Sequence, residues 1–581
     1  MPLFWNGFLL LYLPLAIRIA SPSVAGAERI WLLLVLTEAT CALKFLNDPS
    51  GFIQFDEFPH WETANDILTT HGLFTENPIL VVSPLYPGLE IVTTALVNLS
   101  GLSVFHAGMF VVMVCRATFM AGLFALYKQI SGSDRLAGVA CLFYMGSSVW
   151  VMFESQFAYE TIAVALMAVV LSAAAELDAG HGPSWRLLAA SIPVICVLAL
   201  THHMTSYFTT LILCAGAALH LLGRGVGQTA PIVLLACSAV VAVVGWTWFI
   251  GNPDTSYMGP LLVEGGDQLF RLLRGHGPQH QFFELAPDVV PTPLWLQIEG
   301  IASVAILVVL LCRGFLSSLA RAVAVPGHTG WPTLLDLARC RWHNNYLFFV
   351  SLLALAWPMT LALRLTSAGW QLGNRLAGFA FIGVGIVCAI SIARLWRDSR
   401  QWGAALLTGI GVAIVAVGGA ISGWGVVAVR AQYHVEGDAL SIEPMGIDAA
   451  SWTLRWLGSG NRFTADHDNK VLLATYGRQH IVPGIFEDPG AANLYIFSRV
   501  SRQLHEEIME AHIDYLLVDM RTTTRRPYLN EFFEQGEPEE IESAPLDPEP
   551  LLKWDEEPGV SRVFDDGWIR IYDVRALQHA W

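Results

Sequence analysis

Charged residues are scarce in this sequence. They make up 14% of its 581 positions, whereas 54% of the positions are apolar. The mean hydropathy is +0.50. These values lie outside the usual balance of a soluble globular protein and favour a chain that has the lipid bilayer as its solvent.

An excess of basic residues is also missing, because the formal net charge is −16. Residues 1–429 hold 22 acidic and 19 basic side chains, and residues 430–581 hold 27 acidic and 14 basic ones. Phosphate backbones are bound by positive surfaces, so a nucleic-acid partner is not expected. The acidity belongs to the C-terminal part of the chain.

Cysteine is absent from residues 430–581, and the nine cysteines of the chain all precede them. Most of these cysteines lie in apolar runs and have no metal-ligand spacing. Neither a disulfide framework nor a cysteine metal site is therefore expected.

Long apolar runs dominate residues 1–429 and predict about twelve membrane-spanning helices. The predicted spans are 3–20, 28–46, 104–127, 136–152, 161–178, 187–200, 203–222, 229–250, 294–313, 345–363, 376–396 and 402–429. The apolar run from Leu85 to Leu99 directly follows Pro84 and contains Pro87, and only about a dozen helical residues remain after these prolines. It predicts a helix along the outer interface rather than a further span.

Lysine and arginine occur in every second connection between the predicted spans, which assigns those connections to the cytoplasmic face. These residues are Arg18, Arg29, Lys128, Arg135, Arg186, Arg224, Arg313, Arg321, Arg339, Arg341, Arg394, Arg397 and Arg400. A first outer loop at 47–103, a long outer loop at 251–293 and the whole of 430–581 are then extracytoplasmic. The predicted architecture is a transmembrane domain at 1–429 and a small, acidic, soluble α/β domain at 430–581.

Within the soluble part, apolar runs predict strands at 471–476 and 515–518. The dipeptide Asp566-Gly567 between two strand-like segments predicts a β-hairpin.

Adjacent carboxylates open the first outer loop, at Asp56 and Glu57. Their neighbours Phe55, Phe58 and Trp61 suit the membrane interface, where they would lower the water content around Asp56. A carboxylate in that setting could act as a general base. The plain alternative is a solvated loop with ordinary acidic residues.

Other polar residues, most of them near the predicted outer ends of spans, are candidates for substrate binding. They are His60, Arg116, Glu154, Glu160, His202, His203, Arg364 and Arg375. Structural explanations compete for each of them: caps of a short loop for the glutamates, interfacial packing for the histidines, and snorkelling for the outer arginines. Arg116 falls inside a span, where an unpaired charge is costly. The guanidinium groups of Arg364 and Arg375 suit a phosphate.

The order of these features resembles the GT-C superfamily of membrane glycosyltransferases, in the branch of protein mannosyltransferases and lipid A aminoarabinose transferases. The resemblance rests on residues 28–180. The residues and motifs that carry it are Asp56-Glu57, the segment Ser83-Pro84-Leu85-Tyr86-Pro87-Gly88, Gly101, Arg116, Tyr127 and Glu154.

The resemblance implies a GT-C-like fold and a polyprenyl-phosphate-linked sugar as donor, with an acceptor hydroxyl on a glycan, lipid or protein at the outer face. By the same resemblance, Asp56 deprotonates the acceptor, Glu57 orients either the acceptor or Asp56, and transfer proceeds with inversion. No cofactor is certain, and a divalent cation held by Asp56 and Glu154 is compatible with the resemblance. Arg364 and Arg375 are assigned to the leaving phosphate from their predicted side of the membrane and not from a matched motif.

Two departures from the family pattern are an extra span before the usual first helix and the separation of Glu154 from Glu160. A transporter or flippase of lipid-linked saccharides is an alternative function, and a non-catalytic protein of the cell envelope is another. A transporter predicts internal repeats and charge near the bilayer midplane.

Overall fold

The computed structural model describes most of the chain. The described residues are 2–47, 49–179, 184–224, 230–251, 254–275, 277, 283, 292–322, 344–366, 369–398, 401–423, 433, 435, 441–482, 492–527, 532, 533, 537, 541 and 544–579. They form two compact units. We call the first the helical unit, which includes Met1–Pro49 and most of 108–428. The second, the loop–tail unit, includes Ser50–Ala107 and Val429–Trp581.

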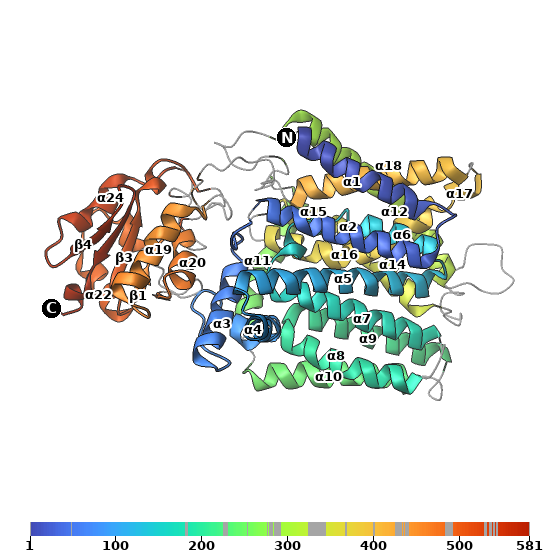
Figure 1. Cartoon of the computed structure of the whole chain (residues 1–581), viewed down its shortest axis with the longest axis horizontal. Helices are drawn as coiled ribbons and strands as arrows, with labels where there is room; N and C mark the ends of the chain where they lie inside the picture. The colour runs from blue at the N-terminus through green and yellow to red at the C-terminus, as the bar shows by residue number, and fades with distance from the viewer. Residues whose placement is uncertain are drawn as a thin grey trace. The chain divides into compact units, whose positions relative to one another are not determined.

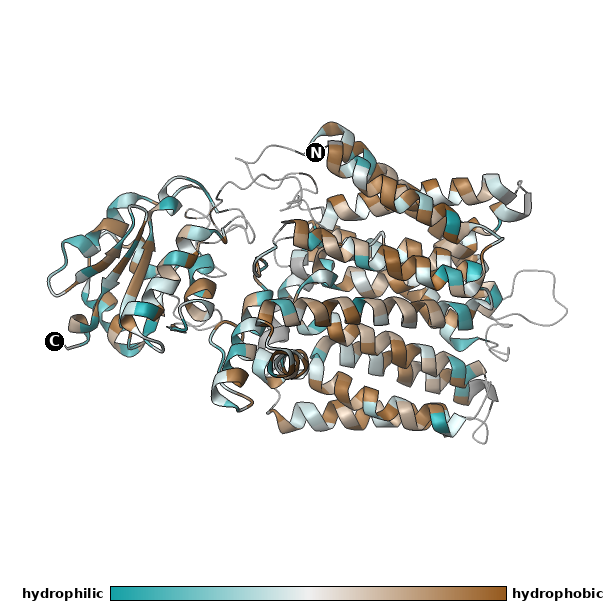
Figure 2. Ribbon diagram, in the orientation of Figure 1, coloured by the Kyte–Doolittle hydropathy of each residue, from teal (hydrophilic) through white to brown (hydrophobic). Residues whose placement is uncertain are grey.

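Long apolar helices build the helical unit (Figures 1 and 2). Their bounds are α1 Pro2–Ala20, α2 Gly26–Asn47, α5 Val104–Ser131, α6 Asp134–Tyr144, α7 Tyr159–Ala179, α8 Ser184–Thr201, α9 His203–Arg224, α10 Ala230–Phe249, α11 Asp254–Leu273, α12 Leu294–Ala322, α14 Asn345–Leu353, α15 Trp357–Leu363, α16 Gly369–Ile392, α17 Leu395–Asp398 and α18 Gln401–Gly423. Short 3-10 turns lie at η2 Phe153–Ser155 and η4 Ala354–Ala356.

Ten segments within the described residues are long and apolar enough to cross a membrane, so the chain is a multi-pass helical membrane protein. The sequence predicted about twelve spans, and the two that differ are 28–46 and 136–152. The first is helical as α2, but it carries Glu28, Arg29, Glu38 and Lys44 and is not among the ten. The second is helical only to Tyr144, and its 11 residues are too short for a span of about 20.

The early end of α6 has a packing cause. A Cβ atom on Gly146 would lie 2.5 Å from the Val415 side chain, and one on Gly419 would lie 2.2 Å from the Gly146 carbonyl oxygen. The chain therefore leaves the helix where α18 passes against its backbone. The residues that follow, 145–158, form a compact and largely buried turn before α7.

α16 lies at the centre of the helical unit, where it packs against α6, α12 and α15. Glycines on α16 allow this close packing: a Cβ on Gly383 would lie 2.3 Å from the Val350 carbonyl oxygen. The hydroxyl of Tyr127 on α5 donates a hydrogen bond of 2.7 Å to the carbonyl oxygen of Ile382 on α16. Such backbone contacts fix α16 relative to its neighbours.

Parts of the predicted membrane topology lie outside the described residues. These include Arg339, Arg341 and Arg400, the side chains of Arg224 and Arg397, and much of the predicted outer loop 251–293. Within that loop the structure describes α11. The sidedness of the loops and the division of the chain at residue 430 stay predictions.

We call Val429–Trp581 the tail and Ser50–Ala107 the first-loop segment of the loop–tail unit. A five-stranded mixed sheet forms the centre of the tail (Figure 1). Its order is β2-β1-β3-β5-β4, in which β1 is parallel to β2 and β3, and β5 is antiparallel to β3 and β4. The strands are β1 Arg462–Thr464, β2 His480–Ile481, β3 Tyr515–Asp519, β4 Ser561–Asp565 and β5 Ile569–Asp573. The accompanying helices are α19 Pro444–Leu457, α20 His467–Thr475, α21 Asn493–Ile496, α22 Arg502–Glu510 and α24 Pro548–Leu552, with 3-10 turns η7 Met520–Thr523, η8 Lys553–Asp555 and η9 Arg575–His579.

The first-loop segment of the same unit contains α3 Glu57–Thr70, the 3-10 turn η1 Ser83–Leu85 and α4 Gly88–Ser100. The short helix predicted after Pro87 is confirmed as α4, which has 13 residues. Its position at the membrane interface stays a prediction.

Two strand predictions for the tail are confirmed and one is wrong. The 515–518 segment is β3, and the Asp566-Gly567 turn joins β4 to β5, with the Asp566 carboxylate accepting from the backbone N–H of Trp568. Residues 471–476 lie in and directly after the helix α20 instead. The Asp466 carboxylate caps that helix by accepting from the backbone N–H of Asn469 at 3.0 Å. A short, fully buried apolar run does not distinguish strand from helix by its periodicity.

Candidate functional site

A single turn of the helical unit, residues 145–158 between α6 and α7, is contacted by three arginines from three elements. Arg116 on α5 donates from Nη1 to the Trp150 carbonyl oxygen at 2.7 Å. Arg364, directly after α15, donates from Nη2 to the Ser148 hydroxyl. The guanidinium of Arg375 on α16 lies 5.8 Å from the centroid of the Phe153 ring. All three were singled out from the sequence as candidates, and the fold brings them to one place.

Arg116 holds the turn in position through several contacts. It is 2% exposed, its guanidinium stacks 3.9 Å above the Trp150 ring, and its Nη2 donates to the Thr40 hydroxyl at 3.3 Å. The indole N–H of Trp150 donates to the same hydroxyl at 3.1 Å. Glu38 and Glu154 are close enough for their charges to interact with Arg116. Within the fold, this buried arginine therefore has a carbonyl oxygen, a hydroxyl and an aromatic ring as direct partners.

Glu154 accepts a hydrogen bond from the hydroxyl of Tyr144, at the end of α6. Burial raises the pKa of Glu154 from its usual 4.5 to about 7, although the Tyr144 hydrogen bond and the charge of Arg116 oppose the increase. A carboxyl group with such a pKa can both donate and accept a proton near neutral pH. Sequence reasoning missed Tyr144, because a tyrosine in an apolar run carries no signal of its own.

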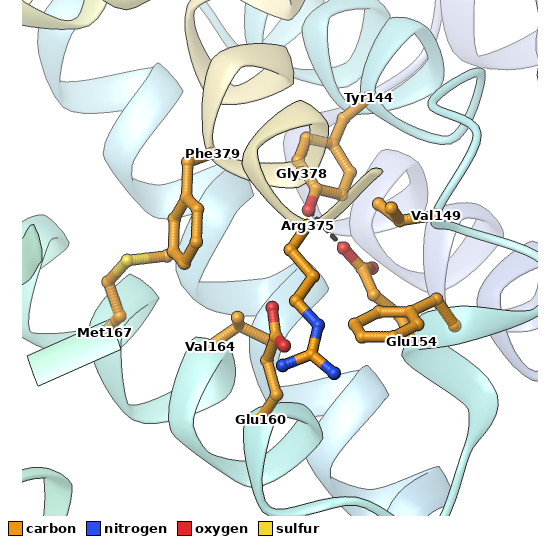
Figure 3. Close-up of a pocket in the computed structure, with 10 residues that line it drawn as sticks. Tyr144, Val149, Glu154, Glu160, Val164, Met167, Arg375, Gly378 and Phe379 are labelled. Carbon is orange, nitrogen blue, oxygen red and sulfur yellow. Dashed lines mark hydrogen bonds between the residues drawn. The ribbon is translucent and has the colours of Figure 1, made fainter. Parts of the chain in front are cut away.

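The Tyr144–Glu154 pair lines a small cavity, which Figure 3 shows. Glu160 on α7 and Arg375 on α16 face the same cavity, and its other walls are Val149, Phe153, Val164, Met167, Gly378 and Phe379. The cavity volume is about 10 Å³, which is room for roughly one water molecule and not for a sugar. A larger ligand would have to move the turn or its walls.

The predicted histidine pair lies near this turn, at the junction of α8 and α9. The ring of Tyr159, the first residue of α7, lies 4.3 Å from the ring of His202 and 6.1 Å from that of His203. His202 Nδ1 hydrogen-bonds to the Thr205 hydroxyl at 2.8 Å. Both histidines are buried and pack against the residue that precedes Glu160.

The acidic pair belongs to the loop–tail unit, and its two members differ in their surroundings. Glu57 is fully buried, and its Oε2 accepts from the backbone N–H groups of Ile53 and Gln54, both at 3.2 Å. This carboxylate closes the turn that leads into α3. Asp56 is half-buried, and its side chain makes no capping hydrogen bond to that helix. A catalytic role for either residue stays a prediction.

His60 is held by a buried network within the first-loop segment. Its Nδ1 lies 2.6 Å from Oε1 of Glu90 on α4 and 3.3 Å from the Ser83 hydroxyl. Both His60 and Glu90 are almost inaccessible to solvent. Sequence reasoning missed Glu90, although a carboxylate inside the apolar run 85–99 was a signal, because a buried charge needs a partner.

Within the part of the chain that the structure describes, no group of three or more His, Cys, Asp or Glu side chains could hold a metal ion. Asp56 and Glu154 belong to different units. A divalent cation between them stays a prediction.

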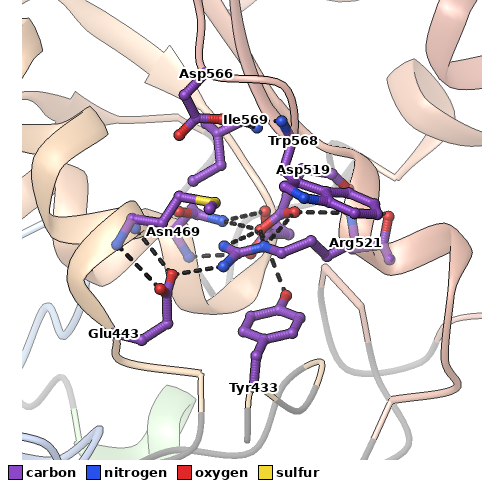
Figure 4. Close-up of polar contacts among 12 residues, drawn as sticks. Tyr433, Glu443, Asn469, Asp519, Arg521, Asp566, Trp568 and Ile569 are labelled. Atoms are coloured by element: carbon purple, nitrogen blue, oxygen red, sulfur yellow. Dashed lines mark hydrogen bonds and ion pairs between the residues drawn. The ribbon is translucent and has the colours of Figure 1, made fainter.

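A polar network at the end of β3 has a structural explanation (Figure 4). Arg521 donates to both oxygens of Asp519 and, at 2.6 Å, to Glu443 before α19. Its guanidinium lies 3.9 Å from the centroid of the Tyr433 ring. Asn469 on α20 also donates to Asp519, at 3.2 Å. The network joins α19, α20 and β3.

No protein-family model matches the chain, and no curated protein matches it. Solved structures to which the chain is similar include ArnT from Cupriavidus metallidurans bound to undecaprenyl phosphate. That match has a TM-score of 0.46 and 12% identity and covers 94% of this chain and 98% of that one. The apo state of the same protein matches with a TM-score of 0.46 and 12% identity over 95% of this chain and 99% of that one. At these values the similarity assigns no activity to this chain.

Proposed function

We propose that the chain is an integral membrane glycosyltransferase that transfers a sugar from a polyprenyl-phosphate-linked donor to an acceptor hydroxyl on the outer face of the membrane. The observation that supports this function best is the convergence of Arg364 and Arg375 on one turn beside a buried carboxyl group. A lipid-linked sugar phosphate needs a cationic site that is reached from the bilayer.

Arg364 is the stronger candidate for holding the phosphate. It is 7% exposed, and its Nε has no hydrogen-bond partner among the described residues. Burial lowers the pKa of Arg364 to about 10, so the guanidinium remains charged at neutral pH. Arg364 donates to the hydroxyl of Ser148 rather than to a carboxylate. A buried cation with an unpaired N–H donor is stabilised by an anion that accepts a hydrogen bond, and a phosphate oxygen provides both the charge and the acceptor.

Arg375 supplies the second cation, and the acidic residues near it suit a sugar. Arg375 faces the cavity that Glu154 and Glu160 also line (Figure 3). Carboxylates accept hydrogen bonds from sugar hydroxyls, and arginines donate to phosphate oxygens. In our proposal Glu154 and Glu160 bind the donor sugar, while Arg364 and Arg375 hold the phosphate as negative charge develops on it. The histidine pair His202 and His203 packs against Tyr159, the residue that precedes Glu160.

Asp56 is the proposed general base. It removes the proton of the acceptor hydroxyl, whose oxygen attacks the anomeric carbon as the bond to the lipid phosphate breaks, with inversion. Glu57 fixes the turn that carries Asp56 through its two backbone hydrogen bonds. His60, whose ring is oriented by Glu90, also binds the acceptor in this proposal. A divalent cation would add positive charge near Asp56 or Glu154, where carboxylate oxygens are suitable ligands.

Transfer of radiolabelled sugar from a panel of polyprenyl-phosphate donors, in membranes that contain the full-length protein, tests this function. Arg364→Ala should reduce transfer about 100-fold, which is the usual effect of removing one charge-stabilising donor. Arg394→Ala is the matched control, because Arg394 is an exposed arginine beyond the other end of α16. Equal transfer by the two variants would remove Arg364 from the mechanism. A wild-type protein that moves label across a sealed vesicle without forming product would support the transporter alternative instead.

A further inference from the structure

The hydrophobic core of the tail is completed by residues of the first outer loop. Phe58 on α3 is fully buried, and Ile79 is 2% exposed. Both belong to one cluster with Phe463 on β1, Leu472 on α20 and Ile571 on β5. Along β3, Tyr515 and Leu517 face this cluster, whereas Leu516 and Val518 face a second one, as expected for alternate residues of a strand. The first-loop segment therefore contributes to the core that covers one face of the sheet.

Aromatic contacts place α20 directly against the residues that flank the acidic pair. The ring of His467 stacks on that of Phe55, with centroids 4.5 Å apart and an angle of 15° between the planes. Tyr476, which follows α20, meets Trp61 edge to face at 4.8 Å. Phe55 immediately precedes Asp56 in the chain. The tail therefore contributes a ring that contacts the residue next to this carboxylate.

A polar contact between the two segments lies just beyond the C-terminal end of α20. Arg478 donates from Nη2 to the carboxylate of Asp66 and to the hydroxyl of Thr69, both at 3.2 Å. Its φ of 52° lies in the left-handed region, which residues other than glycine adopt only where their surroundings favour it. The tail thus contacts three parts of the first loop. These are Phe55 just before α3, the buried face of α3, and the last turns of α3.

We propose that the C-terminal α/β tail is a structural part of the proposed catalytic centre, in which the Phe55–His467 stack positions Asp56 for its reaction. His467 is a positioning residue and not a catalytic one. The role of Asp56 rests on the proposed function, whereas the coupling between the tail and the loop does not. A tail that only bound a partner or a cell-wall polymer would not need to supply a ring beside the acidic pair.

The ring of His467 acts here as a neutral aromatic group. Burial, with the nearby charge of Lys470, lowers the pKa of His467 to about 3. The histidine therefore carries no charge at neutral pH and contributes packing to the stack. Removing either ring should have the same consequence, because each has the other as its stacking partner.

A double-mutant cycle on the full-length protein tests the inference. His467→Ala and Phe55→Ala should each reduce kcat about 10- to 100-fold and leave KM for the lipid-linked donor unchanged, because a small misplacement of a reacting group has an effect of that size. The double variant should be no more than about twofold slower than the slower single variant. His505→Ala, in α22 of the same tail, is the matched control and should retain the wild-type kcat.

Wild-type kcat in His467→Ala, or losses that multiply in the double variant, would overturn the inference. A second measurement does not depend on activity. Backbone amide hydrogen exchange of residues 53–60 should become faster in His467→Ala and stay unchanged in His505→Ala. Unchanged exchange in His467→Ala would refute the coupling even if the protein transfers sugar. Faster exchange in a protein without transferase activity would support the coupling and reject the proposed function.

Discussion

The buried carboxyl group of Glu154 should make the stability of the helical unit depend on pH. Burial raises its pKa from 4.5 to about 7, so the folded protein binds this proton more tightly than the unfolded chain does. Stability from this group is therefore full below about pH 4.5 and is lost as the pH rises through about 7. Because a tenfold change in proton affinity corresponds to about 1.4 kcal/mol, the loss above pH 7 is on the order of 3 kcal/mol.

Glu154→Gln removes the ionisation and keeps an oxygen that can accept from Tyr144. Relative to the wild type, this variant should be equally stable near pH 4.5 and more stable at pH 8, by up to about 3 kcal/mol. Thermal unfolding of the purified protein in detergent, measured across this pH range, provides the test. Glu264→Gln, at an exposed position of α11, is the control for the loss of one carboxylate.

A stability difference between the wild type and Glu154→Gln that does not change with pH would refute the reasoning. That result would mean that Glu154 ionises as easily in the fold as in water. Tyr144→Phe gives an independent check, because the hydrogen bond from Tyr144 opposes the increase in the pKa of Glu154. Its loss should move the pH dependence to a higher pH.

Three further predictions concern the other parts of the molecule. Phe58→Ala should destabilise the loop–tail unit by about 3–5 kcal/mol, measured by denaturant unfolding, because it leaves a cavity in a core that includes both the first loop and the tail. Arg478→Ala should cost less than about 1 kcal/mol in the same assay, because its ion pair with Asp66 is partly exposed to solvent; a loss as large as that of Phe58→Ala would contradict this ranking. Glu90→Ala should reduce transfer more than Glu90→Gln, because only the amide can still accept from His60, and equal rates would show that Glu90 does not orient that ring.

Periodicity and length predicted most of the membrane helices, because an apolar run long enough to cross a bilayer leaves few other structures open. The predictions failed where tertiary contacts or a helix cap, and not local composition, determined the secondary structure. The run 136–152 contains enough apolar residues for a span, but contact with α18 at Gly146 ends the helix at Tyr144. The 471–476 run has strand composition, but Asp466 caps it as a helix.

The candidate site was predictable in its residue types and not in its contacts. The sequence marks Arg116 as a costly charge inside a span and Arg364 and Arg375 as outer arginines that suit a phosphate, and the fold brings all three to one turn. Tyr144 was missed because a hydroxyl on an aromatic ring is common in apolar helices. The stack of His467 on Phe55 joins residues more than 400 positions apart, and no local pattern indicates such a contact.

The measurement that tests the central claim most directly is transfer of radiolabelled sugar from polyprenyl-phosphate donors by wild-type membranes beside membranes that contain Asp56→Asn. We expect label to leave the donor and appear in product only with the wild type, while both proteins bind the donor equally, because the amide replaces the base without removing the phosphate site. Transfer by Asp56→Asn at the wild-type rate would contradict the account.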